Sequence, residues 1–211
     1  MRRSLVALAT AAVFGLGWTA GQVFSQDMGG GEKKDGGGAP AGGPSPEEMD
    51  AMMKAATPGE QHRKLSGLAG EWTCTGKMWM DPKGPATESV GGAKGRMIYD
   101  GRFLIQDITG DFMGMPFEGM SLVGYDNTLK EYVGAFVCNM GTGIMASKGK
   151  ENADGTITFT GDCINAMGQK ESFREVMTFK DKDTVTSVMH MTTPKFPEEV
   201  KAMEWTYTRK K

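Results

Sequence analysis

The stretch VGYDNTLKEYVGAFVC, Val123 to Cys138, places two runs of apolar and aromatic residues on either side of a polar centre. Both runs alternate their side chains with the period of two that is typical of a half-buried β-strand. The centre, Asp126-Asn127-Thr128, favours a turn, because Asp and Asn side chains bond to backbone amides close to them in the chain. We therefore predict an antiparallel hairpin, with Asp126 as a structural residue at its tip.

The same period of two continues on both sides of this hairpin, from Gly70 to the C-terminus. Tight-turn pairs such as Asp100-Gly101 and Asp154-Gly155 separate the segments. One helical interruption is expected at Pro197–Met203. The predicted strands are Glu71–Met80, Glu88–Tyr99, Arg102–Asp111, Phe117–Tyr125, Lys130–Asn139, Gly143–Lys150, Thr156–Cys163, Glu171–Lys180, Thr184–Met191 and Ala202–Arg209.

Ten strands joined mostly by short turns predict an up-and-down arrangement. An open sheet of this size leaves two unprotected edges, and closure into a barrel removes them. We therefore expect an all-β fold, a roughly ten-stranded antiparallel β-barrel with a short N-terminal helix. The helix is predicted from Ser45, a capping residue followed by Pro46 and two glutamates. A second short helical piece, Glu60–Ser66, is expected to cover one end of the barrel.

The first 57 residues differ from the rest in composition. Residues 1–25 are typical of a secretion signal, with Arg2 and Arg3 before the uncharged, apolar Leu5–Trp18. This stretch is shorter than the roughly 20 residues of a spanning helix, so an uncleaved anchor is only the alternative reading. Residues 26–57 predict a Gly/Pro-rich linker with a short helix. Residues 58–211 form the domain, and we expect an exported protein, periplasmic or extracellular, without a membrane span in its mature chain.

Charge and motifs narrow the classes of function. The net charge is −2, and no basic block is present to neutralise phosphates, so a nucleic-acid partner is not expected. The sequence contains no HExxH, GxSxG or P-loop motif, so no catalytic residue, metal ligand or cofactor is assigned. An enzyme built on carboxylates stays open. The carboxylates considered are Asp107, Asp111, Glu118, Asp126, Asp162, Glu171 and Glu175.

Three segments carry a resemblance to a known family: LSGLAGEWTCTGKMW, GRFLIQDITGDFMGMPFEGMSLVGYDNTLKEYVGAF and MEWTYTRKK. They resemble the domain-of-unknown-function family numbered 1579 over about residues 58–211. The most specific piece is the GxPFEGxxxxGYDN block, Gly114 to Asn127. The resemblance implies a calycin-like barrel and no assigned activity. Gly70-Glu71-Trp72 also resembles the GxW opening of lipocalins, which implies that a late arginine, here Arg209, packs across Trp72 as a structural plug.

The interior of such a barrel can hold a small ligand. We therefore expect a non-catalytic barrel that binds a small apolar or amphipathic molecule. The segment Asp111–Met120 is expected to be a lid over the cavity mouth or a buried plug. The residues expected to contact the ligand are Trp72, Met78, Phe103, Met113, Met115, Phe117, Tyr132, Phe136 and Phe159.

Two alternatives stay open beside ligand binding. The barrel can be filled by its own side chains and serve as a structural or interaction module of the cell envelope. It can also bind a soft metal such as copper, or haem, since three M-x-M triplets occur and His190 resembles the haem-binding histidine of nitrobindin-type barrels. His62 is expected to be exposed. Three cysteines, Cys74, Cys138 and Cys163, allow one disulfide and one free thiol.

Overall fold

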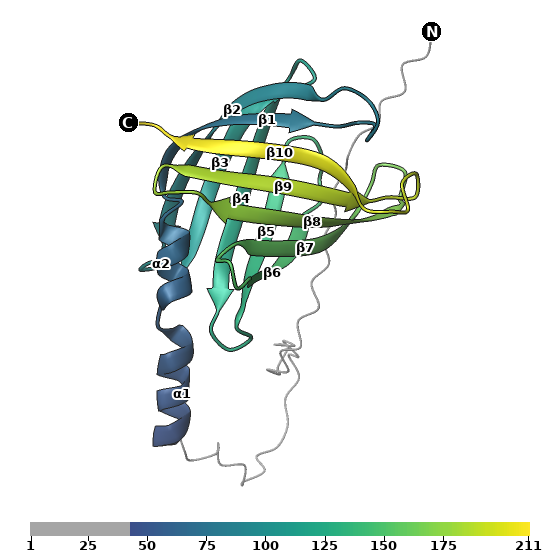
Figure 1. The fold of residues 1–211 in the computed structure, drawn as a ribbon. Helices are drawn as coiled ribbons and strands as arrows, with labels where there is room; N and C mark the ends of the chain where they lie inside the picture. Colours follow the sequence, from purple (N-terminus) through teal and green to yellow (C-terminus); the bar gives the residue numbers. More distant parts are fainter. Residues whose placement is uncertain (1–42) are drawn as a thin grey trace, which may run out of the picture.

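Ten antiparallel strands close into one barrel, in which every strand pairs with its neighbour in the chain and β1 pairs with β10 (Figure 1). The computed structural model describes residues 43–211. It confirms the predicted all-β, up-and-down barrel and all ten strands, whose bounds differ from the predicted ones by at most two residues. The strands are β1 (Gly70–Met78), β2 (Thr87–Ile98), β3 (Phe103–Phe112), β4 (Met115–Asp126), β5 (Glu131–Cys138), β6 (Met145–Glu151), β7 (Ile157–Ile164), β8 (Lys170–Phe179), β9 (Thr184–Thr192) and β10 (Val200–Arg209).

The first helix, α1 (Pro46–Ala56), extends away from the barrel and buries none of its residues (Figure 1). Its start forms as predicted, because the Ser45 side chain accepts from the Glu48 amide and the Glu48 carboxylate accepts from the Ser45 amide at 2.7 Å. Its end is held by the barrel. The Asn127 side-chain amide donates to the carbonyls of Ala55 and Thr57, at 3.0 and 2.8 Å. One turn residue thus links α1 to the β4–β5 hairpin.

The second helix, α2 (Glu60–Ser66), lies against one end of the barrel and closes it. Leu65 and the following Leu68 are buried in the main core cluster beside Trp72. Burial of a leucine side chain contributes about 1.5–3 kcal/mol. This apolar contact explains why so short a helix is stable, because a seven-residue helix is marginal without packing.

His62, expected to be exposed, is only 5% exposed, so that prediction is wrong. Its ring packs edge-on against Tyr125, with 5.9 Å between the centroids. Its Nδ1 accepts from the Gly59 amide at 3.0 Å and so caps the start of α2. The helical period placed His62 on a surface, but the barrel end covers that surface.

The predicted helical interruption at Pro197–Met203 is also wrong, since the chain enters β10 at Val200. Val200 pairs with Met191, and the register then shifts between Lys201 and Met203, as in a β-bulge. The local sequence favours a helical turn, but pairing with β9 and β1 satisfies the backbone of this segment on both sides. Tertiary pairing therefore overrides the local preference.

The segment Asp111–Met120, expected to be a loop, is a hairpin. Phe112 still pairs with Met115, so that only Met113 and Gly114 form the turn. Both have positive φ, 56° and 83°, as a two-residue type I′ turn requires. The lid prediction is corrected accordingly, because a mobile loop is replaced by paired strands up to the tip.

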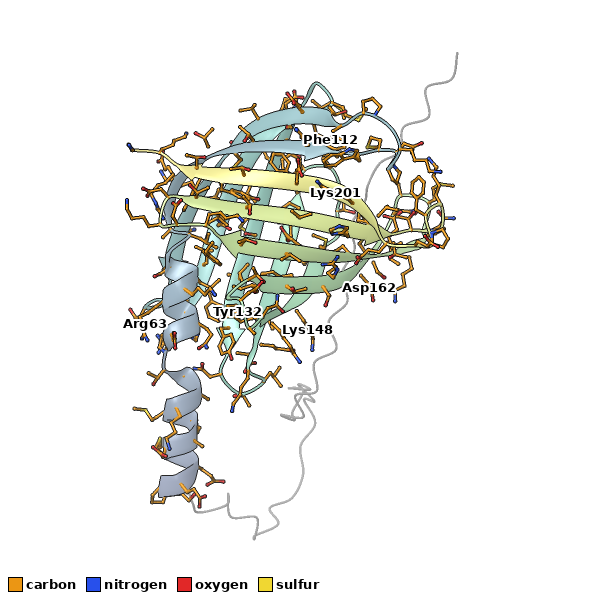
Figure 2. The ribbon with its side chains drawn as sticks, viewed as in Figure 1. Arg63, Phe112, Tyr132, Lys148, Asp162 and Lys201 are labelled. Carbon is orange, nitrogen blue, oxygen red and sulfur yellow. The ribbon has the colours of Figure 1, made fainter. Side chains whose placement is uncertain are left out.

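The predicted secretion signal, residues 1–25, and the first part of the predicted linker, residues 26–42, lie outside the described residues. None of the helices within residues 43–211 is long and apolar enough to cross a membrane. Figure 2 shows the side chains on the two surfaces of the barrel wall, with Lys148 on the outside near β6. The inner surface is where the candidate site lies.

Candidate site in the barrel interior

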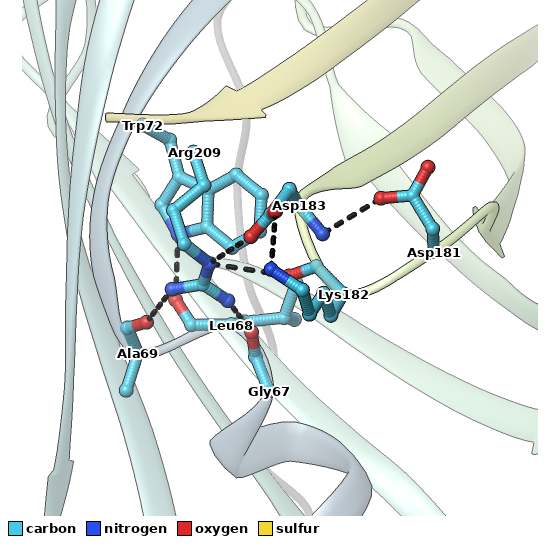
Figure 3. Close-up of polar contacts among 8 residues, drawn as sticks. All are labelled: Gly67, Leu68, Ala69, Trp72, Asp181, Lys182, Asp183 and Arg209. Atoms are coloured by element: carbon cyan, nitrogen blue, oxygen red, sulfur yellow. Dashed lines mark hydrogen bonds and ion pairs between the residues drawn. The ribbon is translucent and has the colours of Figure 1, made fainter. Parts of the chain in front are cut away.

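Arg209 and Trp72 lie together at the closed end, where the last strand meets the first (Figure 3). The guanidinium carbon of Arg209 is 4.2 Å from the centroid of the Trp72 ring. Nη1 and Nη2 donate to the carbonyls of Ala69 and Gly67, both at 2.6 Å, and Nε donates to the Lys182 carbonyl at 3.1 Å. The pairing implied by the lipocalin resemblance is therefore present, and Arg209 joins β10 to the segment after α2.

The remaining polar groups at this end are also satisfied. The Trp72 indole Nε1 donates to the Leu68 carbonyl at 3.0 Å. The Asp183 carboxylate lies 3.3 Å from Nε of Arg209. Asp126 acts as predicted on the nearby hairpin, since its Oδ1 accepts from the amides of Thr128 and Leu129. The polar groups named here are thus paired with one another at the closed end.

Further along the barrel, aromatic rings lie on glycines of the neighbouring strands. A Cβ atom on Gly149 would come within 2.7 Å of the Phe159 ring, and one on Gly76 would overlap the Trp205 ring. The pairs are Gly76–Trp205, Gly119–Phe136, Gly149–Phe159 and Gly161–Phe173. Each ring lies flat against the wall, where a glycine has no side chain. It therefore extends less far from the wall into the barrel interior. The glycines therefore make room inside the barrel.

Burial along the inner surface changes from one end to the other. Near α2, inward-facing side chains such as Leu104, Tyr132 and Ile157 have no exposed surface. Towards the middle and the far end, many inward-facing residues are only half-buried although the wall surrounds them. These residues are Gln106, Ile108, Ser121, Phe136, Ser147, Glu175, Trp205 and Tyr207.

The structure places the residues expected to contact a ligand in different parts of the barrel. Trp72, Tyr132 and Phe159 belong to the buried core near the closed end. Phe117 and Phe136 are half-buried on the inner surface.

Phe103 does not share this surface. It lies on the face of β3 opposite to the buried Leu104, against Gly124 and edge-on to Tyr99. Its expected interior position is corrected, because Leu104 pairs with the inward-facing Val123 and the adjacent Phe103 therefore points to the other face of the wall.

Met78, Met113 and Met115 lie at the far end of the barrel. Met78 and Met113 line one small pocket of about 170 Å³, together with Phe112. Met113 and Met115 are exposed at the hairpin tip. The structure therefore brings Met78 and Met113 together at the end that α2 does not cover.

Glu175, one of the carboxylates considered from the sequence, lies on the inner surface. It pairs with Phe159 on one side and Met189 on the other, so that it faces inward from β8. Its carboxylate accepts a hydrogen bond from the hydroxyl of Ser187, on β9. Burial raises the pKa of Glu175, and the Ser187 hydrogen bond only partly opposes this. The alternation Phe173, Glu175, Met177 was the available signal, since the two apolar neighbours mark an inward face.

Tyr207, on β10, is a titratable inward-facing residue whose ionisation the charge of Glu175 affects. Burial raises the pKa of Tyr207, and the charges of Glu175 and Cys74 raise it further. Cys74 pairs directly with Tyr207 across β1 and β10. Burial also raises the pKa of the Cys74 thiol, to about 11. Near neutral pH these neighbours are uncharged, so that they offer Glu175 no cation.

Three methionines form a row beside this carboxyl. Met78 pairs with Met203, Met203 pairs with Met189, and Met189 pairs with Glu175. Directly paired side chains in antiparallel strands lie on one face, with Cβ atoms about 4.5–5.5 Å apart. The row therefore runs around the inner surface from β1 to β8. It contains Met78 of the triplet Met78-Trp79-Met80 and Met189 of the triplet Met189-His190-Met191.

A second pocket, of about 350 Å³, lies on the outer surface over β7, β8 and β9. Arg174 and Glu199 form a two-bond ion pair in it, at 2.8 and 2.7 Å. His190 lines the same pocket, and its Nδ1 is buried without a hydrogen-bond partner. No three His, Cys, Asp or Glu side chains within residues 43–211 are arranged to hold a metal ion.

The three cysteines are free thiols, so the structure contains no disulfide between them. Cys74 and Cys163 are buried, and Cys138 is partly exposed. Burial raises the pKa of Cys163 to about 11, with the charges of Glu171 and Asp162 adding to the effect. Cys74 and Cys163 therefore act as small apolar side chains of the inner surface.

Comparison with curated proteins finds no match to this chain. Comparison with protein families finds one, described as Protein of unknown function (DUF1579), which matches residues 57–209. The match covers α2 and all ten strands, including the Trp72–Arg209 closure and Glu175. The sequence resemblance is thereby confirmed, and the chain belongs to the DUF1579 family.

Proposed function

We propose that this protein binds a small apolar or amphipathic molecule inside its barrel, without catalysis. The observation that supports this most is the difference between the two ends of the inner surface. One end is sealed by Leu65, Leu68 and the Trp72–Arg209 pair, whereas inward-facing side chains beyond it keep accessible surface. Ligand sites are concave and mostly apolar, with a few polar groups. The half-buried inner surface has this composition.

The polar members of that surface lie on two opposite parts of the wall. Gln106 and Ser121 pair directly across β3 and β4. Glu175 and Ser187 lie on β8 and β9. Because Gln106 and Ser121 are half-buried, an amphipathic ligand can hydrogen-bond to them while its apolar part contacts aromatic and methionine side chains. This favours an amphipathic ligand over a fully apolar one.

The test is a titration with the neutral fluorophore N-phenyl-1-naphthylamine, whose emission rises in apolar surroundings. Wild-type protein is expected to bind it at one saturable site. Ser121→Trp places a large ring in the interior and is expected to abolish binding. Met120→Trp is the matched control, because Met120 is the neighbouring residue on the exposed face of β4.

Circular dichroism and a cooperative melt establish that each variant is folded. Gln106→Trp, opposite Ser121, serves as a second interior variant. Binding that is unchanged in both interior variants would place the fluorophore elsewhere. No binding by folded wild-type protein would support the alternative of a barrel filled by its own side chains.

A soft-metal site is the second candidate, supported by the row Met78, Met203 and Met189. Thioether sulfur favours Cu(I) and Ag(I), and the row offers three such groups on adjacent strands. Titration with Ag(I) is expected to raise the melting temperature if the row binds metal, and Met203→Leu should remove the effect. An unchanged melting temperature would leave these residues as apolar lining.

We also propose that the protein is exported to the periplasm or the extracellular space. Support comes from the sequence alone: Arg2 and Arg3 followed by the apolar Leu5–Trp18. Cell fractionation followed by intact-mass measurement tests this. A mature chain in the exported fraction that lacks about the first 25 residues is the expected result.

A further inference from the structure

The inner surface carries acidic side chains, and the basic side chains of the strands do not face them. Among the inward-facing positions of the ten strands, Arg209 is the one basic residue, as the strand registers show. Its guanidinium is fully used at the closed end, by the carbonyls of Gly67, Ala69 and Lys182 and by Asp183. No basic side chain of the described strands is therefore left to meet an anionic ligand inside the barrel.

Two glutamates face inward from β8, and they differ in their partners. Glu171 lies near the β7–β8 turn, where the Asn165 side-chain amide donates to it at 2.9 Å. Glu175 lies two inward positions deeper, and its partner is the Ser187 hydroxyl. A carboxylate enclosed in this way costs several kcal/mol to ionise unless a cation accompanies it. Glu175 is thus the inner-surface group that a cationic ligand would satisfy.

Aromatic side chains surround the position that such a cation would take. Phe159 pairs directly with Glu175, and Trp205 pairs directly with Ser187. Tyr207 lies close enough for the charge of Glu175 to affect its ionisation. Aromatic faces attract cations, and the attraction is stronger where water is excluded. A carboxyl group and aromatic faces together recognise an ammonium group.

We propose that the barrel takes a cationic amphipath, a molecule with one ammonium group on an alkyl or aryl chain. The ammonium lies against the Glu175 carboxylate, beside Ser187 and the ring of Phe159. The chain follows Met189, Met203 and Met78 towards the end that α2 leaves uncovered. The inference rests on the proposed function and names the ligand class for that site.

The same inner surface selects against fatty acids and other anionic amphipaths. A carboxylate ligand would lie near Glu175 with no basic residue to compensate either charge. Juxtaposed like charges in a buried site are a strong element of specificity. The structure therefore orders the ligands by head group: amine first, then neutral alcohol, then carboxylate.

Three probes with the same chain and different head groups test this order: octylamine, octan-1-ol and octanoate. Each displaces N-phenyl-1-naphthylamine from wild-type full-length protein near neutral pH. Octylamine is expected to bind at least about tenfold more tightly than octanol, and octanoate more weakly than octanol. Octanoate binding as tight as octylamine would overturn the proposal, and this comparison needs no variant.

Glu175→Gln then assigns the preference to one residue. The amide keeps the shape and removes the charge, so the preference for octylamine over octanol is expected to disappear. Glu171→Gln is the matched control on the same face of β8 and should keep the preference. A preference that persists in Glu175→Gln would contradict the assignment.

The outcomes also separate this inference from the proposed function. If the fluorophore and all three octyl compounds fail to bind folded protein, ligand binding itself is wrong. If octanol binds and octylamine binds no better, the barrel holds amphipaths but the role of Glu175 is wrong.

Discussion

The Arg209 guanidinium stacks on the Trp72 ring with 4.2 Å between its central carbon and the ring centroid, and this contact joins the last strand to the first. The same guanidinium binds the carbonyls of Gly67 and Ala69, which follow α2. One side chain therefore contacts both the barrel closure and the segment that follows the sealing helix. The loss of this side chain should weaken both.

Arg209→Ala is expected to destabilise the fold by about 2 kcal/mol, from lost stacking and unsatisfied carbonyls. For a domain of this size that lowers the melting temperature by roughly 4–8 °C. Differential scanning calorimetry measures it. The neighbouring exposed Lys210→Ala is the control and should have no effect. A melting temperature equal to wild type would show that the pair does not stabilise the closure.

Glu175→Gln is expected to stabilise the folded protein at neutral pH. Burial raises the pKa of Glu175 in the folded state above its ordinary value of 4.5, so the native state binds the proton more strongly than the unfolded state. Stability therefore falls as the pH rises from about 4.5 through the folded-state pKa, and Gln removes this loss.

The measurement for Glu175→Gln is urea unfolding of wild type and variant at a series of pH values. The difference between the two cancels the titration of the other carboxylates. The free energy difference should favour Gln at neutral pH and shrink as the pH falls towards 4.5. A difference that grows on acidification would mean that Glu175 is ionised and stabilised by a cation.

Asn127→Ala is expected to release the end of α1 without unfolding the barrel. The Asn127 amide supplies the described contacts of the barrel to the Ala55 and Thr57 carbonyls, and none of the α1 side chains is buried. Hydrogen exchange of the α1 amides should therefore become faster while that of β4 and β5 stays the same. Asn139→Ala, which removes a side-chain bond to the Pro116 carbonyl, is the control. Unchanged exchange in α1 would show that α1 is held by something else.

Thiol labelling should distinguish the three cysteines. Cys74 and Cys163 are buried, and burial raises the pKa of each to about 11, so few of their thiolates exist near neutral pH. Cys138 is partly exposed and is expected to react first. Cys138→Ser should remove the fast phase of iodoacetamide labelling of the native protein. A fast phase that survives would mean that the interior opens readily to solvent.

The strand pattern could be predicted from sequence because one face of each strand is buried and the turns carry Asp, Asn and Gly at fixed places. The predictions were wrong where tertiary contacts determine the exposure or the backbone conformation of a residue. His62 is covered only because the barrel end lies over it, and Val200 is extended only because β9 pairs with it. Both Phe103 and Leu104 are apolar, and only the pairing of Leu104 with Val123 decides that Leu104 faces inward.

The candidate site was less accessible to prediction. The aromatic lining could be inferred from alternation, as with Phe136 and Phe159. The surroundings of Glu175 could not, because only closure of the barrel determines which side chains of the other strands face it. The residues that face Glu175 across the barrel lie far from it in the sequence. No short stretch of sequence therefore shows which side chains surround it.

Native mass spectrometry of the full-length protein with excess N-phenyl-1-naphthylamine tests the central claim, that the barrel interior holds a ligand. The account predicts one bound molecule per chain in wild type and in Met120→Trp, and none in Ser121→Trp. Absence of a complex with folded wild-type protein, or equal occupancy in Ser121→Trp, would contradict it.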